Sequence, residues 1–350
     1  MTSPPPFDVD AAARARAHQA QLTKPPGSLG RLEELAIFYA GARGRFPAAA
    51  PAKARIYVFA ADHGVAAEGV SPYPSSVTAA MVANFLAGGA AISVLTRASD
   101  IDLRVVDVGV ASPIPAAGDG KLGELLSFPL RKGTANFLRE PAMSRAEAEL
   151  ALGIGARLAT AAASEGVEVL GAGEMGIGNT TAAAAIVAAL TGAAPEVVVG
   201  RGTGVDDAGL ARKIEVVRAS LALHAPDRRD VLGALAAVGG LEIAAMAGLM
   251  LGGAQQRVPV VVDGFISGAS ALVAARLVPG VRDFLCFSHL SAERGHRVVC
   301  DALDARPLFD LGMRLGEGTG AALAINLLRA AVRVQSEMAT FANAGVANRD

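Results

Sequence analysis

The sequence predicts an α/β protein: a doubly wound parallel sheet of about six strands, beside a small all-helical domain formed by both chain ends. Three observations lead to this prediction. Short apolar runs rich in β-branched residues recur along the chain, helical stretches lie between most of them, and segments without convincing strands flank the whole array. Because the apolar runs are nearly continuous rather than alternating, they are typical of strands buried on both faces of a parallel sheet.

The predicted strands are apolar runs bounded by Gly, Asp or Ser, at residues 56–61, 103–108, 167–170, 197–199, 258–262 and 284–287. Helices are predicted at residues 77–95, 146–160, 180–190, 207–223, 232–251, 269–277 and 292–303. Ser144 and Glu147 have the spacing of a capping box at the start of the second of these helices. The alternation of strand and helix predicts a large α/β nucleotide-binding domain over residues 55–291.

The two chain ends are predicted to be helical. Residues 11–22 and 32–40 have helical patterns separated by a turn-rich segment, and residues 320–341 form a long helix rich in Ala, Leu and Val. Helices from the two ends can pack together as a small bundle. Residues 1–54 and 292–350 are therefore predicted to form the small helical domain.

The composition excludes some classes of function. The 350 residues include 32 basic and 33 acidic side chains, and this balance excludes broad electrostatic binding to nucleic acid or to an anionic membrane. The uncharged residues 175–195 are diluted by Gly, Asn and Thr, so no transmembrane helix is predicted. The N-terminus lacks a secretory pattern, and two cysteines fit a reducing compartment. We therefore expect a cytoplasmic protein.

The functional site is expected where the predicted strands end, because ligands of open parallel sheets bind beyond the carboxyl ends of the strands. The residues that follow the predicted strands are rich in glycine and polar groups. They are residues 62–64, 171–181, 200–204, 263–264 and 288–291.

Two glycine-rich turns indicate a phosphate-binding site. Residues 174–181 place glycines and hydroxyl residues at the start of a predicted helix, where backbone N–H groups and the positive end of the dipole favour an anion. Residues 200–204 form a second such turn, and Lys213 in the helix that follows could direct a positive charge towards the same anion. Either turn alone is explained equally well as a tight connection between a strand and a helix. The pair together favours a phosphate monoester as the ligand.

Glu317 lies between two glycines just ahead of an apolar helix. Spacing alone favours a solvent-facing residue that stabilises the helix N-terminus, and the alternative is a general base presented on an unobstructed turn. His63, His289 and His296 form no set with zinc-like spacing, so they are assigned to hydrogen bonding and packing, and no metal is predicted. Cys286 lies inside an apolar run and is expected in the core.

Seven motifs, in order along nearly the whole chain, carry a resemblance to a known family. They are KPPGSLGRLE at 24–33, ADHGV at 61–65, GEMGIGNTT at 173–181, VGGLE at 238–242, VDGF at 262–265, SHLSAE at 288–293 and MRLGEGTGAA at 313–322. On these motifs the chain resembles the nicotinate-nucleotide:dimethylbenzimidazole phosphoribosyltransferases, which make the lower-ligand nucleotide of cobalamin.

The resemblance implies a reaction, a fold and an assembly. Phosphoribosyl would pass from nicotinate mononucleotide to dimethylbenzimidazole, giving α-ribazole phosphate and nicotinate without a cofactor. The fold would be a Rossmann-like sheet with a helical domain from both chain ends. The assembly would be a homodimer in which the neighbouring subunit completes each active site.

The resemblance also implies roles for individual residues. Glu317 matches the general base that takes the proton of the benzimidazole ring, and Glu174 is placed to stabilise positive charge at the anomeric carbon. Met81 and Phe85, which would line the slot for the base, also fit a core face of a helix, and Met81 stands where some relatives carry a polar residue, which leaves the acceptor base open. The implied phosphate and ribose contacts are Gly176, Asn179, Thr180, Gly202, Lys213, Asp263, Ser291 and Arg314, and the implied base contacts are Tyr73, Pro74, Met81, Phe85 and Leu315.

Three other functions fit parts of the pattern. Gly171, Gly173 and Gly176 match the bare Gly-x-Gly-x-x-Gly spacing of an NAD-dependent oxidoreductase, although no convincing ribose-binding acid ends the next predicted strand. A non-catalytic sensor of a nucleotide or an aromatic base would need the same pocket without a base such as Glu317. A conventional diphosphoribose-donor transferase is disfavoured, because Asp206 and Asp207 do not stand in the expected frame before a Thr-Gly-Gly-Thr-like turn.

Overall fold

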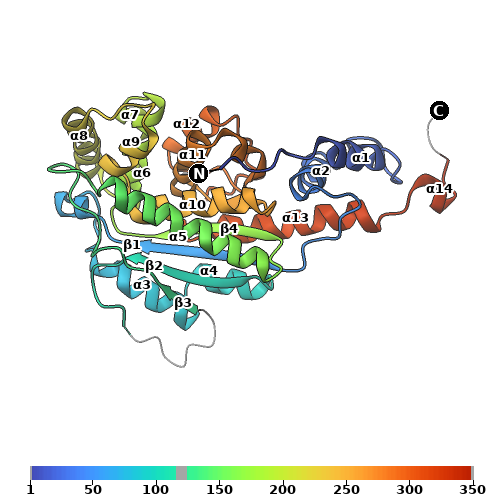
Figure 1. Ribbon diagram of the computed structural model, residues 1–350, viewed down its shortest axis with the longest axis horizontal. Helices are drawn as coiled ribbons and strands as arrows, with labels where there is room; N and C mark the ends of the chain where they lie inside the picture. The colour runs from blue at the N-terminus through green and yellow to red at the C-terminus, as the bar shows by residue number, and fades with distance from the viewer. Residues whose placement is uncertain (1, 116–123, 348–350) are drawn as a thin grey trace.

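Six parallel strands form the centre of the computed structural model, which describes residues 2–115 and 124–347 (Figure 1). The strands are β1 (Ala54–Ala61), β2 (Asp102–Gly109), β3 (Glu124–Ser127), β4 (Val169–Met175), β5 (Val260–Val262) and β6 (Leu285–Phe287). Their order in the sheet is β3-β2-β1-β4-β5-β6. The chain adds strands outward in one direction from β1 and in the other from β4, so the doubly wound topology is confirmed.

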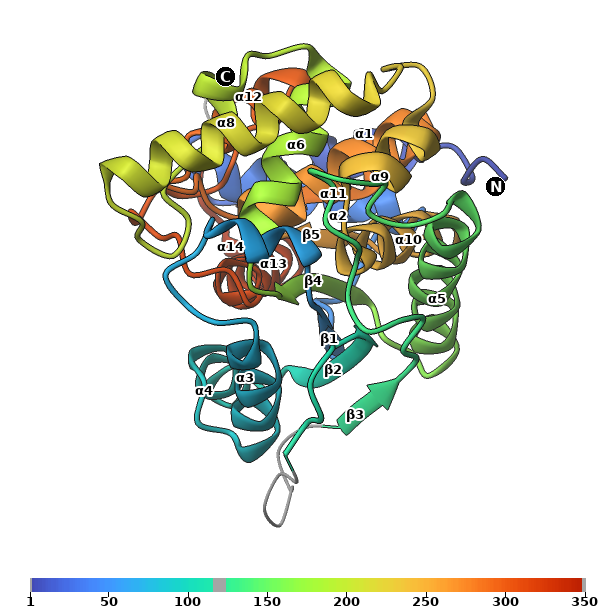
Figure 2. The same ribbon diagram turned by 90° about the vertical axis from the view of Figure 1, so that its left-hand side faces the viewer.

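Both faces of the sheet are covered by helices, as Figure 2 shows. Along β1, Ile56 and Val58 point into one core, whereas Tyr57 and Phe59 point into the other. The first core includes α2 (Arg31–Arg43), α3 (Ser76–Ala87), α4 (Ala91–Ala98) and α13 (Thr319–Glu337). The second includes α5 (Arg145–Ser164), α6 (Asn179–Thr191), α9 (Val231–Val238), α10 (Leu241–Gln255) and α11 (Phe265–Leu277).

One predicted strand is wrong, and one strand was missed. Residues 197–199 were predicted to be a strand, but Pro195 opens a single helical turn, α7 (Pro195–Val198). A strand here could not follow β4 in the sheet as its neighbour, because β4 is already paired with β1 on one side and β5 on the other. The missed strand, β3, is a four-residue edge strand that is only partly buried and carries no long apolar run.

Two predicted helices are each divided in two by glycines. Residues 77–95 form α3 and α4, because Gly88 adopts a φ of 81° and ends α3. Residues 232–251 form α9 and α10, which Gly239 and Gly240 separate. The segment Ser76–Ala98 has the length and apolar composition of a membrane span, but half of it is buried and the break at residues 88–90 interrupts its helical hydrogen bonding.

Helices from the two chain ends pack together (Figure 1). α1 (Val9–Gln19) lies against α2 and α13, and Gln19 donates a hydrogen bond to Gln335 at 3.0 Å. Farther on, Leu22 forms a bridge with Thr340, just before the short α14 (Phe341–Ala344). The first residue and the last three of the predicted small domain lie outside the described residues.

The sheet unit extends beyond the predicted boundary at residue 291. α12 (Gly295–Ala302) packs against α6, α7 and α11, and the first half of α13 packs on the sheet. The remaining elements are α8 (Asp207–His224) and the 3₁₀ helices η1 (Gly64–Glu68) and η2 (Pro279–Phe284). The capping box of Ser144 and Glu147 at the start of α5 is confirmed.

Glycines allow the backbones of α5 and α10 to touch. A Cβ on Gly155 would lie 1.9 Å from the carbonyl oxygen of Ala245, and a Cβ on Gly248 would lie 1.9 Å from that of Leu152. No side chain fits between two backbones at this separation. Gly153, two residues from Gly155 on the same helix, has only the end of the Arg157 side chain near it, at 3.4 Å.

We predict opposite effects for the same substitution at these two glycines. Gly155→Ala forces α5 and α10 apart and lowers the free energy of unfolding by about 1–3 kcal/mol. Gly153→Ala removes backbone entropy from the unfolded chain and raises that free energy by about 0.5–1 kcal/mol. Chemical denaturation of the two variants measures both, and equal effects would contradict the backbone contact.

Candidate active site

A cavity of about 670 Å³ lies at the carboxyl ends of β4, β5 and β6. The residues that follow the predicted strands indicated a functional site at this same edge of the sheet. Its lining combines acidic side chains, glycines and apolar side chains: Tyr73, Val77, Met81, Glu174, Met175, Gly176, Ile177, Asn179, Thr180, Gly202, Thr203, Asp263, Gly264, Phe265, Ile266, Ser267, His289, Ser291, Glu293, Arg314, Leu315, Gly316 and Glu317.

Glu317 lies in a turn with left-handed backbone geometry. Gly316, Glu317 and Gly318 have φ values of 82°, 64° and 88°. Glycine adopts this region freely, whereas a residue with a side chain is strained there by roughly 1–2 kcal/mol. The turn lies directly on β4, because a Cβ on Gly173 would be 2.4 Å from the carbonyl oxygen of Glu317. Strain of this kind at a cavity is typical of a functional residue.

Asp263, at the end of β5, holds this turn in place. Its Oδ1 accepts hydrogen bonds from the N–H groups of Gly320 and Ala321 at 2.7 and 3.1 Å, and its Oδ2 accepts one from Gly318 at 3.2 Å. These donors open α13, whose N-cap residue Gly318 has no side chain of its own. The resemblance assigned Asp263 to the ribose, but in this structure both of its oxygens bind backbone. Burial raises the pKa of Asp263 to about 7, against the effect of these N–H donors.

The Glu317 carboxylate borders the cavity and is buried, with 6% of the residue exposed. Burial raises its pKa, although the backbone N–H of Ile92 at the start of α4 acts in the opposite direction. Within the described residues, Oε2 has no hydrogen-bond partner. A carboxylate with a raised pKa and an unpaired oxygen is suited to accept a proton from a bound ligand.

Glu174, the second predicted catalytic residue, lies beside Glu317. One of its oxygens accepts a hydrogen bond from Asn179, and the other lies 3.4 Å from the backbone nitrogen of Glu317. Burial, reinforced by the negative charges of Asp263 and Glu242, raises the pKa of Glu174 to about 8. The carboxyl of Glu174 is therefore largely protonated at neutral pH when the cavity holds no cation.

The N-terminus of α6 opens into the cavity between Gly176 and Thr180. Gly178, at the N-cap with a φ of 97°, offers no side chain to the helix, and Asn179 and Thr180 line the cavity. Gly176 must be glycine, because a Cβ would lie 2.3 Å from the carbonyl oxygen of Ala61. An open helix N-terminus of this kind favours an anion, as the sequence analysis predicted.

The second glycine-rich turn differs from its prediction. Residues 200–204 follow α7 rather than a strand. They also do not open the next helix, because the Asp206 side chain caps α8 by accepting a hydrogen bond from the Gly209 N–H at 2.8 Å. The N-terminus of α8 is therefore occupied and is not a second phosphate site.

Gly202 nevertheless borders the cavity, and other residues hold it there. Its N–H donates to Glu293 Oε1 at 2.9 Å, and its carbonyl oxygen accepts from Arg314 at 3.1 Å. Lys213, which the sequence placed at the phosphate, lies behind the cavity wall and donates to Thr180 Oγ1 at 2.9 Å. Burial lowers the pKa of Lys213 to about 8.

Three of the five residues predicted for the base slot lie at this cavity. Tyr73, Met81 and Leu315 line the cavity, with Tyr73 and Leu315 more than half exposed at its rim. The prediction for Phe85 is wrong, because this side chain is fully buried in the core between α3 and the sheet. Pro74 is exposed ahead of α3 and does not line the cavity.

His289 and Glu293 line the cavity but were given no site role from the sequence. His289 was assigned to hydrogen bonding and packing, and Glu293 was quoted only as part of a motif. Both follow β6, so their position after a strand was the signal that could have identified them. No group of three or more His, Cys, Asp or Glu side chains suited to a metal ion occurs in the described part of the chain.

Two of the three glycines of the possible dinucleotide-binding motif allow close packing around β4 and do not form a strand-to-helix turn. Gly171 and Gly173 lie within β4 rather than in a turn after it. A Cβ on Gly171 would meet the Ile56 side chain at 2.6 Å, and Gly173 carries the Glu317 turn. Because the motif requires these glycines in the strand-to-helix turn, the structure excludes a dinucleotide fingerprint here.

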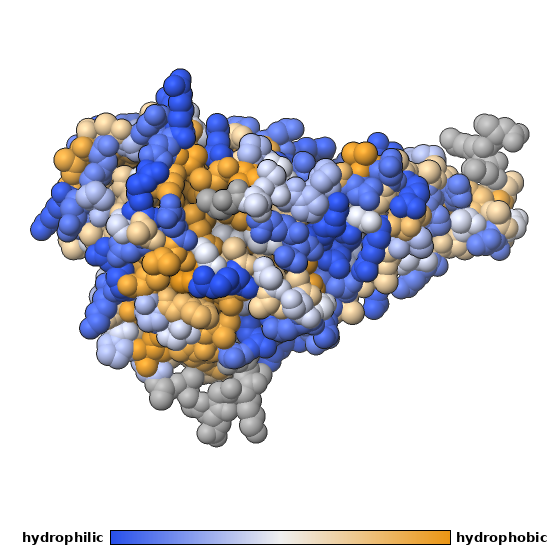
Figure 3. Space-filling view, in the orientation of Figure 1, coloured by the Kyte–Doolittle hydropathy of each residue, from blue (hydrophilic) through white to orange (hydrophobic). Residues whose placement is uncertain are grey.

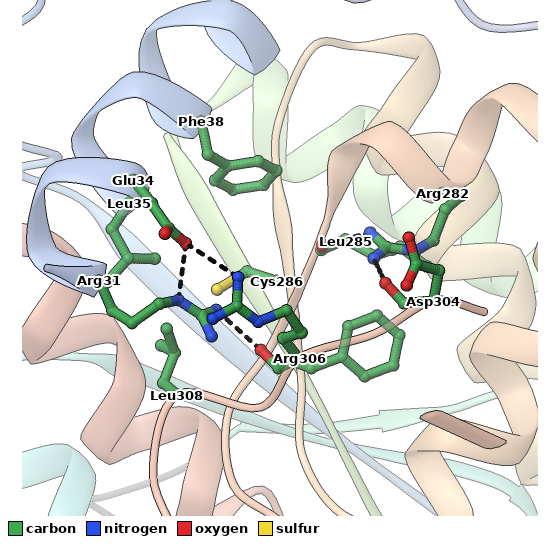
Figure 4. A pocket seen from close by; sticks show the side chains of 11 residues that line it. Arg31, Glu34, Leu35, Phe38, Arg282, Leu285, Cys286, Asp304, Arg306 and Leu308 are labelled. Carbon is green, nitrogen blue, oxygen red and sulfur yellow. Dashed lines mark hydrogen bonds and ion pairs between the residues drawn. The ribbon is translucent and has the colours of Figure 1, made fainter. Parts of the chain in front are cut away.

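A smaller cavity, of about 210 Å³, lies between α2 and β6 (Figure 4). Two of its cations already have partners: Arg31 lies 2.9 Å from Glu34, and Arg282 donates to the carbonyl oxygens of Leu303 and Asp304. Cys286 lines this cavity, and burial raises its pKa to about 12, so its thiol stays protonated. The larger cavity is therefore the candidate active site.

Comparisons with known proteins agree with this geometry. A family model described as phosphoribosyltransferase matches residues 4–346. The nicotinate-nucleotide–dimethylbenzimidazole phosphoribosyltransferase of Chloroflexus aggregans is 55% identical over 344 residues, which cover 98% of this chain and 96% of that protein. The chain belongs to this phosphoribosyltransferase family. The resemblance seen in the sequence motifs is thereby confirmed.

Other members of the family also match over nearly the whole chain. The enzyme of the same name from Chromobacterium violaceum is 53% identical over 351 residues, which cover 100% of this chain and 99% of that protein. The crystal structure of the nicotinate-nucleotide–dimethylbenzimidazole phosphoribosyltransferase from Thermus thermophilus matches with a TM-score of 0.90 at 49% identity, and covers 98% of this chain and 100% of that chain. The Rossmann-like α/β fold is therefore the fold of the family.

We predict that the Glu317 turn stores measurable strain. Glu317→Gly and Glu317→Ala both remove the carboxylate, but only glycine relieves the left-handed backbone, so the Gly variant is more stable by about 1 kcal/mol. Thermal or chemical unfolding measures the difference. At the exposed position Ala161 within α5 the order is reversed, since Ala161→Gly costs about 1 kcal/mol. A Glu317→Ala variant as stable as Glu317→Gly would contradict the strain.

Proposed function

We propose that the protein transfers the phosphoribosyl group of nicotinate mononucleotide to dimethylbenzimidazole, releasing nicotinate and forming α-ribazole phosphate. The observation that carries this proposal is the Glu317 carboxylate, which is buried and borders the same cavity as the open N-terminus of α6. One end of the cavity suits a phosphate, and the other end holds a carboxylate that can act as a general base. Membership of the family supplies the substrates that these two groups would serve.

The phosphate of the nucleotide binds at the α6 end of the cavity. In this turn the N–H groups of Ile177 and Asn179 already donate to Thr78 Oγ1 and to the Gly176 carbonyl oxygen, both at 3.1 Å. The Thr180 N–H and the positive helix dipole remain to attract the anion, and Ser291 and Arg314 border the same space. Lys213 adds a positive charge from behind Thr180. A phosphate held here leaves the ribose over the carboxyl ends of β4 and β5.

The reaction is a single displacement at C1′ of the ribose. One ring nitrogen of dimethylbenzimidazole attacks C1′ with its lone pair, and the bond between C1′ and the nicotinate nitrogen breaks, with its electron pair leaving on nicotinate. Because the donor is a β-nucleotide and the product is α, one displacement with inversion accounts for the stereochemistry. The attack leaves a proton on the second ring nitrogen, and Glu317 accepts it.

Glu174 acts on the charge that develops during this displacement. The donor carries a pyridinium cation, and the ribose gains positive charge as nicotinate leaves. A cation next to Glu174 counteracts the raised pKa of this carboxyl and favours its ionised form. The ionised carboxylate then stabilises the positively charged sugar in a site with little water.

The acceptor base lies in the apolar part of the cavity near Glu317. Tyr73, Met81 and Leu315 form the walls of this part, and a flat aromatic ring buries its faces against such side chains. A non-catalytic sensor would have no use for a buried carboxylate on a strained turn, with one oxygen that has no partner among the described residues. Its substitution is therefore the experiment that separates the enzyme from the sensor.

We also propose that the protein is a cytoplasmic homodimer. Apolar surface gathers over α3 in Figure 3, and Tyr73, Val94 and Leu315 are large apolar side chains that are 52%, 49% and 58% exposed. Tyr73 and Leu315 also line the cavity, so a second subunit on this surface would complete the site. This role accounts for the apolar character of α3 and α4 without a membrane. Neither nucleic acid nor a membrane is proposed as a partner.

We predict that Glu317→Gln abolishes most transfer while nucleotide binding persists. The amide cannot accept the ring proton, so kcat falls by about 10²- to 10⁴-fold, and the affinity for nicotinate mononucleotide changes little. Product formation by mass spectrometry and binding by calorimetry measure the two quantities. NMR of the product identifies the α-anomer. Unchanged turnover would remove Glu317 from the mechanism.

We predict that Glu174 makes nucleotide affinity depend on pH. Below about pH 8 Glu174 is protonated and resembles glutamine, and above it the carboxylate attracts the pyridinium cation. The ratio of wild-type to Glu174→Gln affinity therefore rises between pH 7 and about pH 8 and then levels off. Lys213, whose pKa is also about 8, acts in the opposite direction in both proteins and cancels in this ratio. A ratio independent of pH would contradict the role of Glu174.

We predict that Val94→Glu, on α4, weakens the dimer, because a charge on an apolar interface loses its hydration. Sedimentation at several protein concentrations measures the association. Leu150→Glu provides the matched control, since Leu150 is 54% exposed on α5 on the other face of the sheet. A wild-type protein that sediments as a monomer, or equal effects of both variants, would contradict the proposed surface.

A further inference from the structure

His289 is a cavity residue whose ring is held in one orientation. It follows β6 directly, and 1% of the residue is exposed. Its ring stacks on Phe309 with centroids 6.1 Å apart and an angle of 19° between the planes. The backbones of the two residues are also paired, since the Leu290 N–H donates to the Phe309 carbonyl oxygen at 2.8 Å. The ring is therefore fixed by packing and by the chain itself.

The hydrogen bonds of Ser288 determine which ring nitrogen carries the proton. The Ser288 Oγ lies 2.7 Å from the carbonyl oxygen of Asp263 and 3.1 Å from Nδ1 of His289. The carbonyl oxygen can only accept, so it takes the single hydroxyl proton, and Oγ must accept from Nδ1–H. The Asp263 carboxylate, 3.9 Å from Nδ1, also favours a proton there. In the neutral ring Nε2 therefore carries a lone pair and no proton.

Nε2 lies on the ring edge that faces Gly264, another cavity residue. A Cβ on Gly264 would approach Cε1 and Nε2 of His289 at 3.2 and 3.3 Å, so the glycine leaves space at this edge. Burial lowers the pKa of His289, against the effect of Asp310, and so favours the neutral ring. The neighbouring His296 does not line the cavity, and its Nδ1 accepts a hydrogen bond from the Ser291 N–H at 2.8 Å.

The chemistry of an unprotonated nitrogen selects its partner. A lone pair repels a phosphate oxygen and attracts an O–H or N–H donor. In the proposed function the phosphate binds at the N-terminus of α6, and the ring N–H of the acceptor base gives its proton to Glu317. The nucleotide part that remains between them is the ribose, whose hydroxyl groups are hydrogen-bond donors.

We propose that Nε2 of His289 accepts a hydrogen bond from a ribose hydroxyl of the bound mononucleotide, so that His289 orients the sugar for displacement at C1′. This inference rests on the proposed function for the identity of the ligand. It gives His289 a part in the ribose contact that the resemblance placed at Asp263, whose two oxygens accept hydrogen bonds from the start of α13.

Two variants separate the nitrogens of His289. His289→Asn retains a donor at the position of Nδ1 and removes Nε2. His289→Gln places an amide oxygen near the position of Nε2 and removes Nδ1. Binding of nicotinate mononucleotide and of its 2′-deoxy and 3′-deoxy analogues is measured by calorimetry. Affinity is the readout because removal of a ribose hydroxyl also changes the intrinsic reactivity of C1′.

The expected pattern is a double-mutant cycle between protein and ligand. Wild-type protein binds one deoxy analogue about five- to tenfold more weakly than the natural nucleotide. His289→Asn binds the natural nucleotide more weakly by a similar factor and no longer distinguishes that analogue, whereas His289→Gln retains the distinction. Thermal unfolding confirms that both variants are folded.

Other outcomes would overturn the inference. Wild-type protein that binds both deoxy analogues as tightly as the natural nucleotide has no such hydroxyl contact. A His289→Asn variant that discriminates as strongly as wild type places the contact elsewhere. Failure of the proposed function is seen separately, as the absence of phosphoribosyl transfer by wild-type protein, because the binding cycle requires no turnover.

Discussion

The site depends on one interaction, the binding of the Asp263 carboxylate to the N–H groups that open α13. Gly318 offers the helix no side-chain cap, so β5 supplies the cap from 55 residues earlier in the chain. These hydrogen bonds fix the position of the turn that carries Glu317. A turn that glycines alone would leave free to move is fixed to the sheet, with Gly173 of β4 lying against it, and Glu317 is directed to the cavity.

This arrangement gathers carboxyl groups where water is scarce. Glu174 and Asp263 lie at the ends of the adjacent strands β4 and β5, Glu317 lies in the turn packed on β4, and burial raises the pKa of each. Such a cluster destabilises the protein at neutral pH, because the unfolded chain ionises these groups freely. The same cluster suits a cationic ligand. The same carboxyl groups that lower the folding stability are the ones suited to the reaction.

Periodicity and composition predicted five of the six strands, the edge of the sheet that holds the site, and the open start of α6. They failed where contacts between distant segments determine strand pairing or the burial of a side chain. Residues 197–199 have the composition of a strand, but β4 has no free edge for them. Phe85 and Met81 share one helix, and only packing shows that the first enters the core while the second reaches the cavity. The binding of Asp263 to α13 joins distant segments, so no local pattern reveals it.

A double-mutant cycle between Asp263 and Glu317 tests the central claim most directly. If Asp263 acts by holding the Glu317 turn, Asp263→Asn lowers the kcat of phosphoribosyl transfer strongly in wild-type protein and little in the Glu317→Gln background. Measured kcat values for the four proteins, each confirmed to be folded, give the coupling. An equal loss of kcat in both backgrounds would show that Asp263 acts independently of Glu317 and would contradict this account.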